Sequence, residues 1–327
     1  MKWKQLKLPK SIRTVAIAAA ALASAAALNI ASARRAERRR PAGGRFIDVG
    51  ETRLHYTDEG EGPPVVLLHG NGVTAQDWRS SGVIDALTGA HRVIAFDRPG
   101  FGYSSRSRAH VWTAAAQARL LHEALHELDV EPAVIVGHSW GTLVALALAL
   151  EYPADCKRLL LISGYYFPTV RADVAIFGAP ALPVVGDVLR YTISPPLGYL
   201  LAPLLSAQLF APASVDEAFA ADLPMSMRPW QIRANAEDTA LMVPSAAAME
   251  HRYENLKVPV AIIAGGSDKI VNPTQSSRLA GEIQGSRLLV IDGVGHMVHY
   301  TAKDMIAETI GAMANAVPPL EYDHVLG

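Results

Sequence analysis

The pentapeptide Gly137-His138-Ser139-Trp140-Gly141 constrains the fold of this chain more than any other segment. A β-rich run at residues 133–136 precedes it, and an Ala- and Leu-rich run at residues 140–150 follows it. A chain that passes from strand to helix within so few residues must turn sharply, and glycines on both sides of the turn avoid side-chain clashes. The segment therefore predicts a strand–turn–helix unit that pushes the hydroxyl of Ser139 out over the end of the strand.

Short β-rich runs alternate with helical stretches from residue 45 onward, which is typical of a mostly parallel sheet covered by helices on both faces. We expect helices at residues 112–128, 140–150 and about 302–314. The expected strands, the first two a hairpin around Gly50, lie at residues 46–49, 53–57, 65–68, 92–96, 133–136, 158–162, 260–264 and 287–291.

The alternation stops between about residues 165 and 250, where prolines break the chain into short pieces. A chain of 327 residues with 50% apolar content can bury one large core. We therefore expect one α/β domain at residues 45–327, with an insertion at about residues 165–250.

The N-terminal segment contains an uncharged stretch at residues 14–33, which is long enough to cross a bilayer as a helix. Ala31-Ser32-Ala33 also resembles a signal-peptide cleavage site. A basic cluster that resists translocation follows at once, at Arg34, Arg35, Arg38, Arg39 and Arg40. We interpret residues 1–44 as a retained single-span anchor and basic linker in a bacterial-type inner membrane, of undecided orientation. The alternatives are an exported soluble protein cleaved near Ala33 and a helix lying on the membrane surface.

Charge and cysteine content exclude several classes of partner. Lys plus Arg (30) nearly balance Asp plus Glu (31), so no basic surface indicates nucleic acid. Cys156 is the only cysteine, which rules out an intrachain disulfide or a Cys-rich metal site. No phosphate-binding loop, metal cluster or cofactor motif is found. We expect no metal, no cofactor and a small-molecule apolar substrate; no pattern indicates the oligomeric state.

A serine becomes a good nucleophile only when a base takes its proton and a third group orients that base. His296 follows the last expected strand, within Gly293-Val294-Gly295-His296-Met297, and Asp268 follows the strand before it. The carboxyl ends of parallel strands meet at one edge of a sheet, so both side chains can reach Ser139. We expect Ser139 as the nucleophile, His296 as the general base and Asp268 as the acid that orients it.

Other candidates for these roles are weaker. Asp292 is closer to His296 in sequence but ends the strand itself, and it is kept as the alternative acid. We expect His299 at a helix start or on the surface, and His138 packed beneath the turn. No glycine-flanked turn presents Cys156, so it is not expected to be a nucleophile.

An oxyanion needs preorganised N–H donors, and the glycine-rich loop Leu68-His69-Gly70-Asn71-Gly72 follows the third expected strand. We assign the donors to the backbone N–H groups of Asn71 and Trp140. The alternative is that this loop is a plain strand-ending turn.

Together, the His69-Gly70 loop, Ser139, Asp268, His296 and the stretch Asp97-Arg98-Pro99-Gly100-Phe101-Gly102-Tyr103-Ser104 resemble the α/β-hydrolase family, from about residue 46 to the end. The resemblance implies an eight-stranded, mostly parallel sheet and a helical cap formed by the insertion. It also implies that Asp97 and Arg98 shape the site without reacting. Members similar to haloalkane dehalogenases and epoxide hydrolases carry Asp where this chain has Ser139, which argues against both of those chemistries.

The insertion is rich in large apolar side chains, which suits a lid over an acyl or alkyl group, although about half of them are expected to form the core of the cap. They are Tyr165, Tyr166, Phe167, Phe177, Tyr191, Tyr199, Phe210, Phe219, Met225, Met227 and Trp230. We expect hydrolysis of an ester or thioester through an acyl-enzyme. The alternatives are a C–C bond hydrolase or a cofactor-free perhydrolase with the same triad, and a non-catalytic member that binds a ligand or partner.

Overall fold

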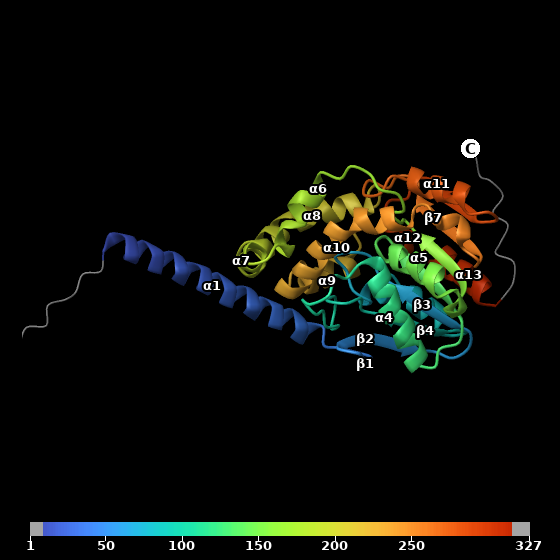
Figure 1. Cartoon of the computed structure of the whole chain (residues 1–327), viewed down its shortest axis with the longest axis horizontal. Helices are drawn as coiled ribbons and strands as arrows, with labels where there is room; N and C mark the ends of the chain where they lie inside the picture. Colours follow the sequence, from blue (N-terminus) through green and yellow to red (C-terminus); the bar gives the residue numbers. More distant parts are fainter. Residues whose placement is uncertain (1–8, 316–327) are drawn as a thin grey trace, which may run out of the picture.

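The computed structural model describes residues 9–315 and contains an eight-stranded sheet flanked by helices (Figure 1). The strand order is β1-β2-β4-β3-β5-β6-β7-β8; β2 pairs antiparallel with β1 and β4, and the other pairs are parallel. The strands are β1 (Arg45–Val49), β2 (Thr52–Glu59), β3 (Pro64–Leu68), β4 (Arg92–Phe96), β5 (Ala133–His138), β6 (Cys156–Ile162), β7 (Val260–Gly265) and β8 (Arg287–Ile291).

The expected strands are confirmed within two residues at each end. The central parallel strands are continuous apolar runs because helices cover both faces of the sheet. Residues of β3 alternate between the two cores: Val66 and Leu68 enter one, and Val65 and Leu67 enter the other. β5 lies between β3 and β6, so the turn after β5 lies at the middle of the sheet edge.

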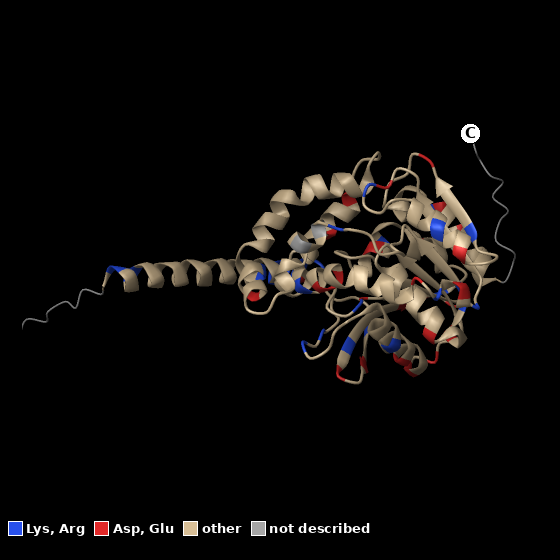
Figure 2. Ribbon diagram, turned by 45° about the horizontal axis from the view of Figure 1, so that its top comes forward, with Lys and Arg blue, Asp and Glu red and all other residues tan. Residues whose placement is uncertain are grey.

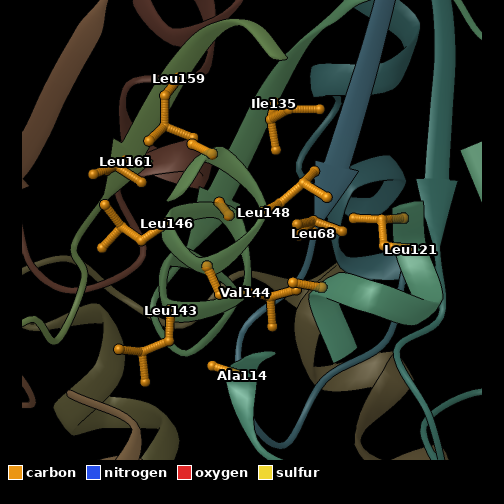
Figure 3. Close-up of a cluster of buried hydrophobic side chains, with 14 of the residues drawn as sticks. Leu68, Ala114, Leu121, Ile135, Leu143, Val144, Leu146, Leu148, Leu159 and Leu161 are labelled. Carbon is orange, nitrogen blue, oxygen red and sulfur yellow. The ribbon is translucent and has the colours of Figure 1, made fainter. Parts of the chain in front are cut away.

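One face of the sheet packs against α4 (Ala114–Glu127), α5 (Gly141–Glu151) and α11 (Thr274–Glu282). Figure 3 shows this core, where Leu143, Leu146 and Leu148 of α5 lie among strand side chains. The other face packs against the remaining helices of the sheet domain. These are α2 (Gln76–Ser80), α3 (Val83–Leu87), α12 (Val298–Thr301) and α13 (Lys303–Ala314).

The insertion contains no strand between β6 and β7 and forms a helical cap. Its helices are α6 (Asp173–Phe177), α7 (Val185–Thr192), α8 (Ser194–Phe210), α9 (Glu217–Ser226) and α10 (Pro229–Met249). Short 3₁₀ turns lie between β6 and β7 at Ala179–Ala181 and Tyr253–Asn255, and another lies before β6 at Pro153–Asp155. The expectation that prolines divide the whole insertion into short pieces is wrong, because α8 continues through Pro203 and α10 through Pro244.

The N-terminal helix α1 (Lys10–Arg39) projects from the body as a long rod and contacts the cap helices α7, α9 and α10 near its C-terminal end (Figure 1). Its most apolar window has a mean hydropathy of 1.9 and contains no buried residue, so the helix is long and apolar enough to cross a membrane. A signal sequence has the same properties. The arginine cluster expected in a linker is helical instead, as far as Arg39.

Candidate active site

Ser139 lies at a sharp turn between β5 and α5, with a positive backbone φ of 53° that side-chain-bearing residues rarely adopt. The flanking glycines are required by contact: a Cβ on Gly137 would lie 2.7 Å from the carbonyl oxygen of Gly141, and one on Gly141 would lie 2.4 Å from the carbonyl oxygen of Leu68. Ser139 is partly exposed while its neighbours His138 and Trp140 are buried. The turn therefore presents only the serine.

His296 and Asp268 form a buried pair at the same sheet edge. His296 Nδ1 lies 2.7 Å from Asp268 Oδ2, and both side chains are at most 3% exposed. Asp268 Oδ1 accepts hydrogen bonds from the backbone N–H groups of Ile270 (2.7 Å) and Val271 (3.0 Å), which fix the carboxylate. Asp292, the alternative acid, lies just after β8 and is exposed.

The loop that carries His296 is held from two sides. The His296 backbone N–H donates to the Leu209 carbonyl of α8 (3.0 Å), and His138 Nε2 lies 3.1 Å from the His296 carbonyl oxygen. The side chain next to Ser139 thus contacts the residue expected to act as its base. Within residues 9–315, no hydrogen bond joins Ser139 Oγ to the His296 ring. Such bonds are often long in unliganded enzymes and shorten when substrate binds.

His138 is buried beneath the turn as expected, and desolvation holds the pKa of its imidazole well below 6.5, with further lowering by His299 and His296. His299 lies at the start of α12, which agrees with the expected helix start. The alternative expectation of a surface position is wrong, because His299 is fully buried. Its Nε2 lies 2.8 Å from Asp77 Oδ2. That long-range partner could not be read from the sequence.

Within the part of the chain that the structure describes, two groups of side chains have metal-ligand spacing. Asp77, His138 and His299 form one, but Asp77 is already occupied by His299 and by the Tyr300 hydroxyl, which donates to Oδ1 at 2.9 Å. The other is partly exposed and comprises His122, His126 and Asp155. Ordinary hydrogen bonds engage both carboxylates, whereas the buried Nδ1 atoms of His138 and His299 have no hydrogen-bond partner among the described residues.

The loop after β3 lies directly against the serine turn. A Cβ on Gly70 would lie 3.1 Å from Ser139 Cβ. The Asn71 side chain donates to the Asn235 carbonyl (3.1 Å) and to Thr239 Oγ1 (3.0 Å), both in α10. Trp140 follows Ser139 directly and begins the turn into α5. The loop and the turn that carry the expected oxyanion donors, Asn71 and Trp140, are therefore neighbours at Ser139.

Arg98 supports this loop from beneath. Its guanidinium donates to the carbonyls of His69 (2.9 Å) and Gly70 (3.0 Å), and it pairs with the fully buried Asp238 of α10 at 2.5 Å. Asp238 also pairs with Arg106 at 3.0 Å. Sequence reasoning missed Asp238, because a carboxylate on a cap helix carries no local pattern that reveals its partner.

The remaining sequence candidates are buried and unreactive. Asp97 accepts from the Ala75 N–H (2.8 Å) and the Tyr103 N–H (2.9 Å) and contacts His55 Nδ1 (2.7 Å), so its carboxylate is fully engaged. Burial raises the pKa of the Cys156 thiol to about 12, with a smaller contribution from Asp155, which keeps the thiol protonated.

A cavity of about 400 Å³ lies between the end of α1, β2 and the loop after β4. Arg39, His55, Asp97 and Tyr103 are among the residues that line it. Ser139, Asp268 and His296 do not line it, so it is not the substrate pocket of this candidate site.

Comparison with known proteins agrees with this geometry. The family model described as alpha/beta hydrolase fold matches residues 63–303. The 2-hydroxy-6-oxo-2,4-heptadienoate hydrolase of Pseudomonas putida is 30% identical, over 78% of this chain and 90% of its own. Haloalkane dehalogenase 2 of Mycobacterium tuberculosis is 25% identical, over 83% and 94%. The crystal structure of a mutant of the meta-cleavage product hydrolase CumD has a TM-score of 0.65 and 25% identity and covers 84% of this chain and 98% of that one. This chain therefore belongs to the α/β-hydrolase family and is a hydrolase of that fold.

Proposed function

We propose that this protein is a membrane-anchored serine hydrolase that cleaves an uncharged carboxylic ester or thioester through an acyl-enzyme. The observation that carries the proposal is the buried 2.7 Å contact between Asp268 and His296, beside the strained turn that presents Ser139. A carboxylate fixed by two backbone N–H groups, an imidazole against it and a partly exposed serine are the parts that acyl transfer requires.

In the proposed mechanism, Asp268 accepts the Nδ1–H of His296, which leaves Nε2 free to take the proton of Ser139. The serine oxygen attacks the acyl carbon, and the oxyanion accepts hydrogen bonds from the N–H groups of Asn71 and Trp140. His296 then protonates the departing alcohol or thiol. Water attacks the acyl-enzyme with His296 again as base, releases the acid and restores Ser139.

The charges of the described residues favour an uncharged substrate. Each buried arginine side chain near the cap already has a carboxylate partner, so none is left over for a substrate carboxylate. The pairs are Arg98 with Asp238, Arg106 with Glu237, Arg190 with Asp187 and Arg228 with Glu37.

A second candidate is hydrolysis of a C–C bond with the same three residues. It is favoured by the 30% identity to a hydrolase whose name specifies an oxo-heptadienoate. That substrate is an anion, and the paired arginines speak against an anion here. Dehalogenation is less favoured, because Ser139 occupies the position at which similar dehalogenases carry Asp.

The membrane anchor in this proposal is α1. The helix has 30 residues, its central part is uncharged, and the arginines from Arg34 onward mark the end of the apolar stretch. Figure 2 shows the projecting part of α1 without charged residues after its first turn. A helix of about 20 apolar residues matches the hydrocarbon thickness of a bilayer.

Turnover by the purified full-length protein in detergent micelles would test the reaction. The panel would contain p-nitrophenyl esters with acyl groups from acetyl to lauroyl, an acyl thioester, and an oxo-dienoate of the meta-cleavage type, with Ser139→Ala as control. We expect the esters to be cleaved at least about 10³-fold faster by the wild type than by the variant. Cleavage of the oxo-dienoate without the esters would establish the C–C alternative. If well-folded protein cleaved none of these, the proposal would be wrong.

A further inference from the structure

The cap carries an apolar surface that nothing in the described part of the chain covers. We define the outer cap face by five large side chains, three in α8 and one at the residue just before each of α7 and α8. They are Val184 (74% exposed), Ile193 (52%), Leu197 (46%), Leu200 (75%) and Leu204 (59%). Single exposed apolar residues are ordinary, but a group of this size on adjoining segments indicates an interaction surface.

Helix α8 shows that this exposure is organised. Ile193, Leu197, Leu200 and Leu204 are spaced by four, three and four residues, so they form one stripe along the helix. Other positions of the helix are buried, at Pro195, Ala202, Ser206 and Phe210. The helix contains no Lys, Arg, Asp or Glu. A cap helix facing water would have a polar outer side, whereas one that is apolar all round is surrounded by apolar material.

The position of α1 identifies that material. Asn29 of α1 donates through Nδ2 to the carbonyls of Tyr191 (2.8 Å) and Thr192 (3.0 Å), at the C-terminal end of α7. Asn29 lies four residues before Ala33, the end of the uncharged stretch, which is about 6 Å along a helix. If residues 14–33 cross a bilayer, the junction of α7 and α8 therefore lies inside the edge of the apolar layer.

The charged residues near the junction of α7 and α8 are consistent with a position at the edge of the apolar layer. The arginine cluster of α1, from Arg34 to Arg40, begins just after the apolar stretch, and most of its members are exposed. Figure 1 shows α7 next to α1 at the point where α1 reaches the body. Together α7 and α8, bent by 62°, also pass the length and hydropathy test for a broken or re-entrant membrane segment.

We propose that the outer cap face docks into the same bilayer leaflet edge as the end of α1, with lipid acyl chains as its occupant. The proposal rests on the anchoring role proposed for α1, but not on the reaction at Ser139. Helices that lie in the interface bury their apolar side about 5–10 Å into the lipid, which matches the depth set by Asn29. The other end of α8 holds the His296 loop through the Leu209 carbonyl, so the docked helix connects the membrane surface to the candidate site.

Fluorescence quenching on the full-length protein in vesicles of phosphatidylcholine and phosphatidylglycerol would test the docking. Single labelling sites would be introduced by Leu200→Cys on the outer cap face, Ala19→Cys on α1 and Val290→Cys on β8. Val290 is 37% exposed on the last strand of the sheet and is the matched control. The native Cys156 is buried and stays unlabelled, which the wild type verifies.

We expect nitroxide groups on the lipid acyl chains to quench the labels at positions 200 and 19. Because iodide is excluded from the apolar layer, we expect it to quench the label at position 200 at least about 5-fold less than the label at position 290. Equal iodide quenching at Leu200 and Val290, with Ala19 still quenched by lipid, would overturn the docking and leave the anchor intact. A Leu200 label shielded from both quenchers would show that protein covers the face, which also overturns it. Iodide quenching of the label at position 19 would refute both the anchor and the docking. The ester turnover assay would still test the reaction at Ser139 independently.

Discussion

Replacing Asp238 with Asn tests whether the buried charge network holds the cap to the sheet domain. Asp238 lies on α10 and is fully buried. It provides the only carboxylate paired with Arg98 among the described residues, and it contributes a second ion pair to Arg106. Asparagine has nearly the same volume, so the change removes charge without opening a cavity.

The expected loss follows from leaving Arg98 without a counter-charge. Arg98 is 2% exposed and cannot regain water. Removing one partner of a buried ion pair costs about 3–5 kcal/mol. The NH₂ group of the new asparagine is a hydrogen-bond donor, and it would face the N–H donors of Arg98 and Arg106. For a domain of this size the loss corresponds to a decrease in melting temperature of about 6–20 °C.

Urea and thermal unfolding of the wild type, Asp238→Asn and Glu237→Gln would measure this. Glu237 is the matched control: it is adjacent in α10 and pairs with Arg106 and Arg233, but its side chain is 19% exposed. Its loss is expected to cost about 1 kcal/mol or less. If Asp238→Asn unfolded within about 2 °C of the wild type, or if Glu237→Gln were the more damaging change, the account of the network would be refuted.

Three further predictions follow from the site. Asp268→Asn is expected to lower ester kcat by about 10⁴-fold, whereas Asp292→Asn leaves it within about 3-fold; equal effects in steady-state assays would contradict the assignment. Gly141→Ala places a Cβ 2.4 Å from a backbone oxygen of β3, so the variant is expected to be insoluble, and a soluble, active variant would show that the turn tolerates a side chain. Burial lowers the folded pKa of His69 to about 3, with Arg98 adding to the shift, and lowers that of His138 as well. The unfolded chain binds these protons near pH 6.5, so the free energy of unfolding is expected to decrease by about 1.4 kcal/mol per histidine for each pH unit below 6.5. Urea midpoints measured against pH would show this slope, and a slope unchanged by His138→Gln would contradict the prediction.

Much of the fold could be predicted from the sequence, because the signals for it are local. The bounds of β4 and β8 match the expected ranges, since each is a short apolar run between turn residues. The strand–turn–helix unit at Ser139 is also recognisable from the sequence. Its flanking glycines, Gly137 and Gly141, lie where a Cβ would clash with backbone oxygens. Asp268 and His296 are expected as partners of Ser139 because they follow the last two strands, as Ser139 follows β5.

The contacts that depend on tertiary packing were not predictable. Nothing near Asp238 in the sequence indicates Arg98, which lies 140 residues away, and nothing near His299 indicates Asp77. The contact between Asn29 and the end of α7 is of the same kind. Proline predicts a helix break, but a proline inside a helix can be accommodated where its lost hydrogen bond faces solvent, as at the exposed Pro203 of α8.

The central claim is that Ser139 is an activated nucleophile, and covalent labelling tests it most directly. The full-length protein would be treated with a fluorophosphonate and the label located by mass spectrometry, with Ser139→Ala and His296→Ala as controls. We expect label on Ser139 in the wild type, none at that site in Ser139→Ala, and at least about 10³-fold slower labelling in His296→Ala. Folded wild type that remained unlabelled, or that reacted equally well without His296, would contradict the account.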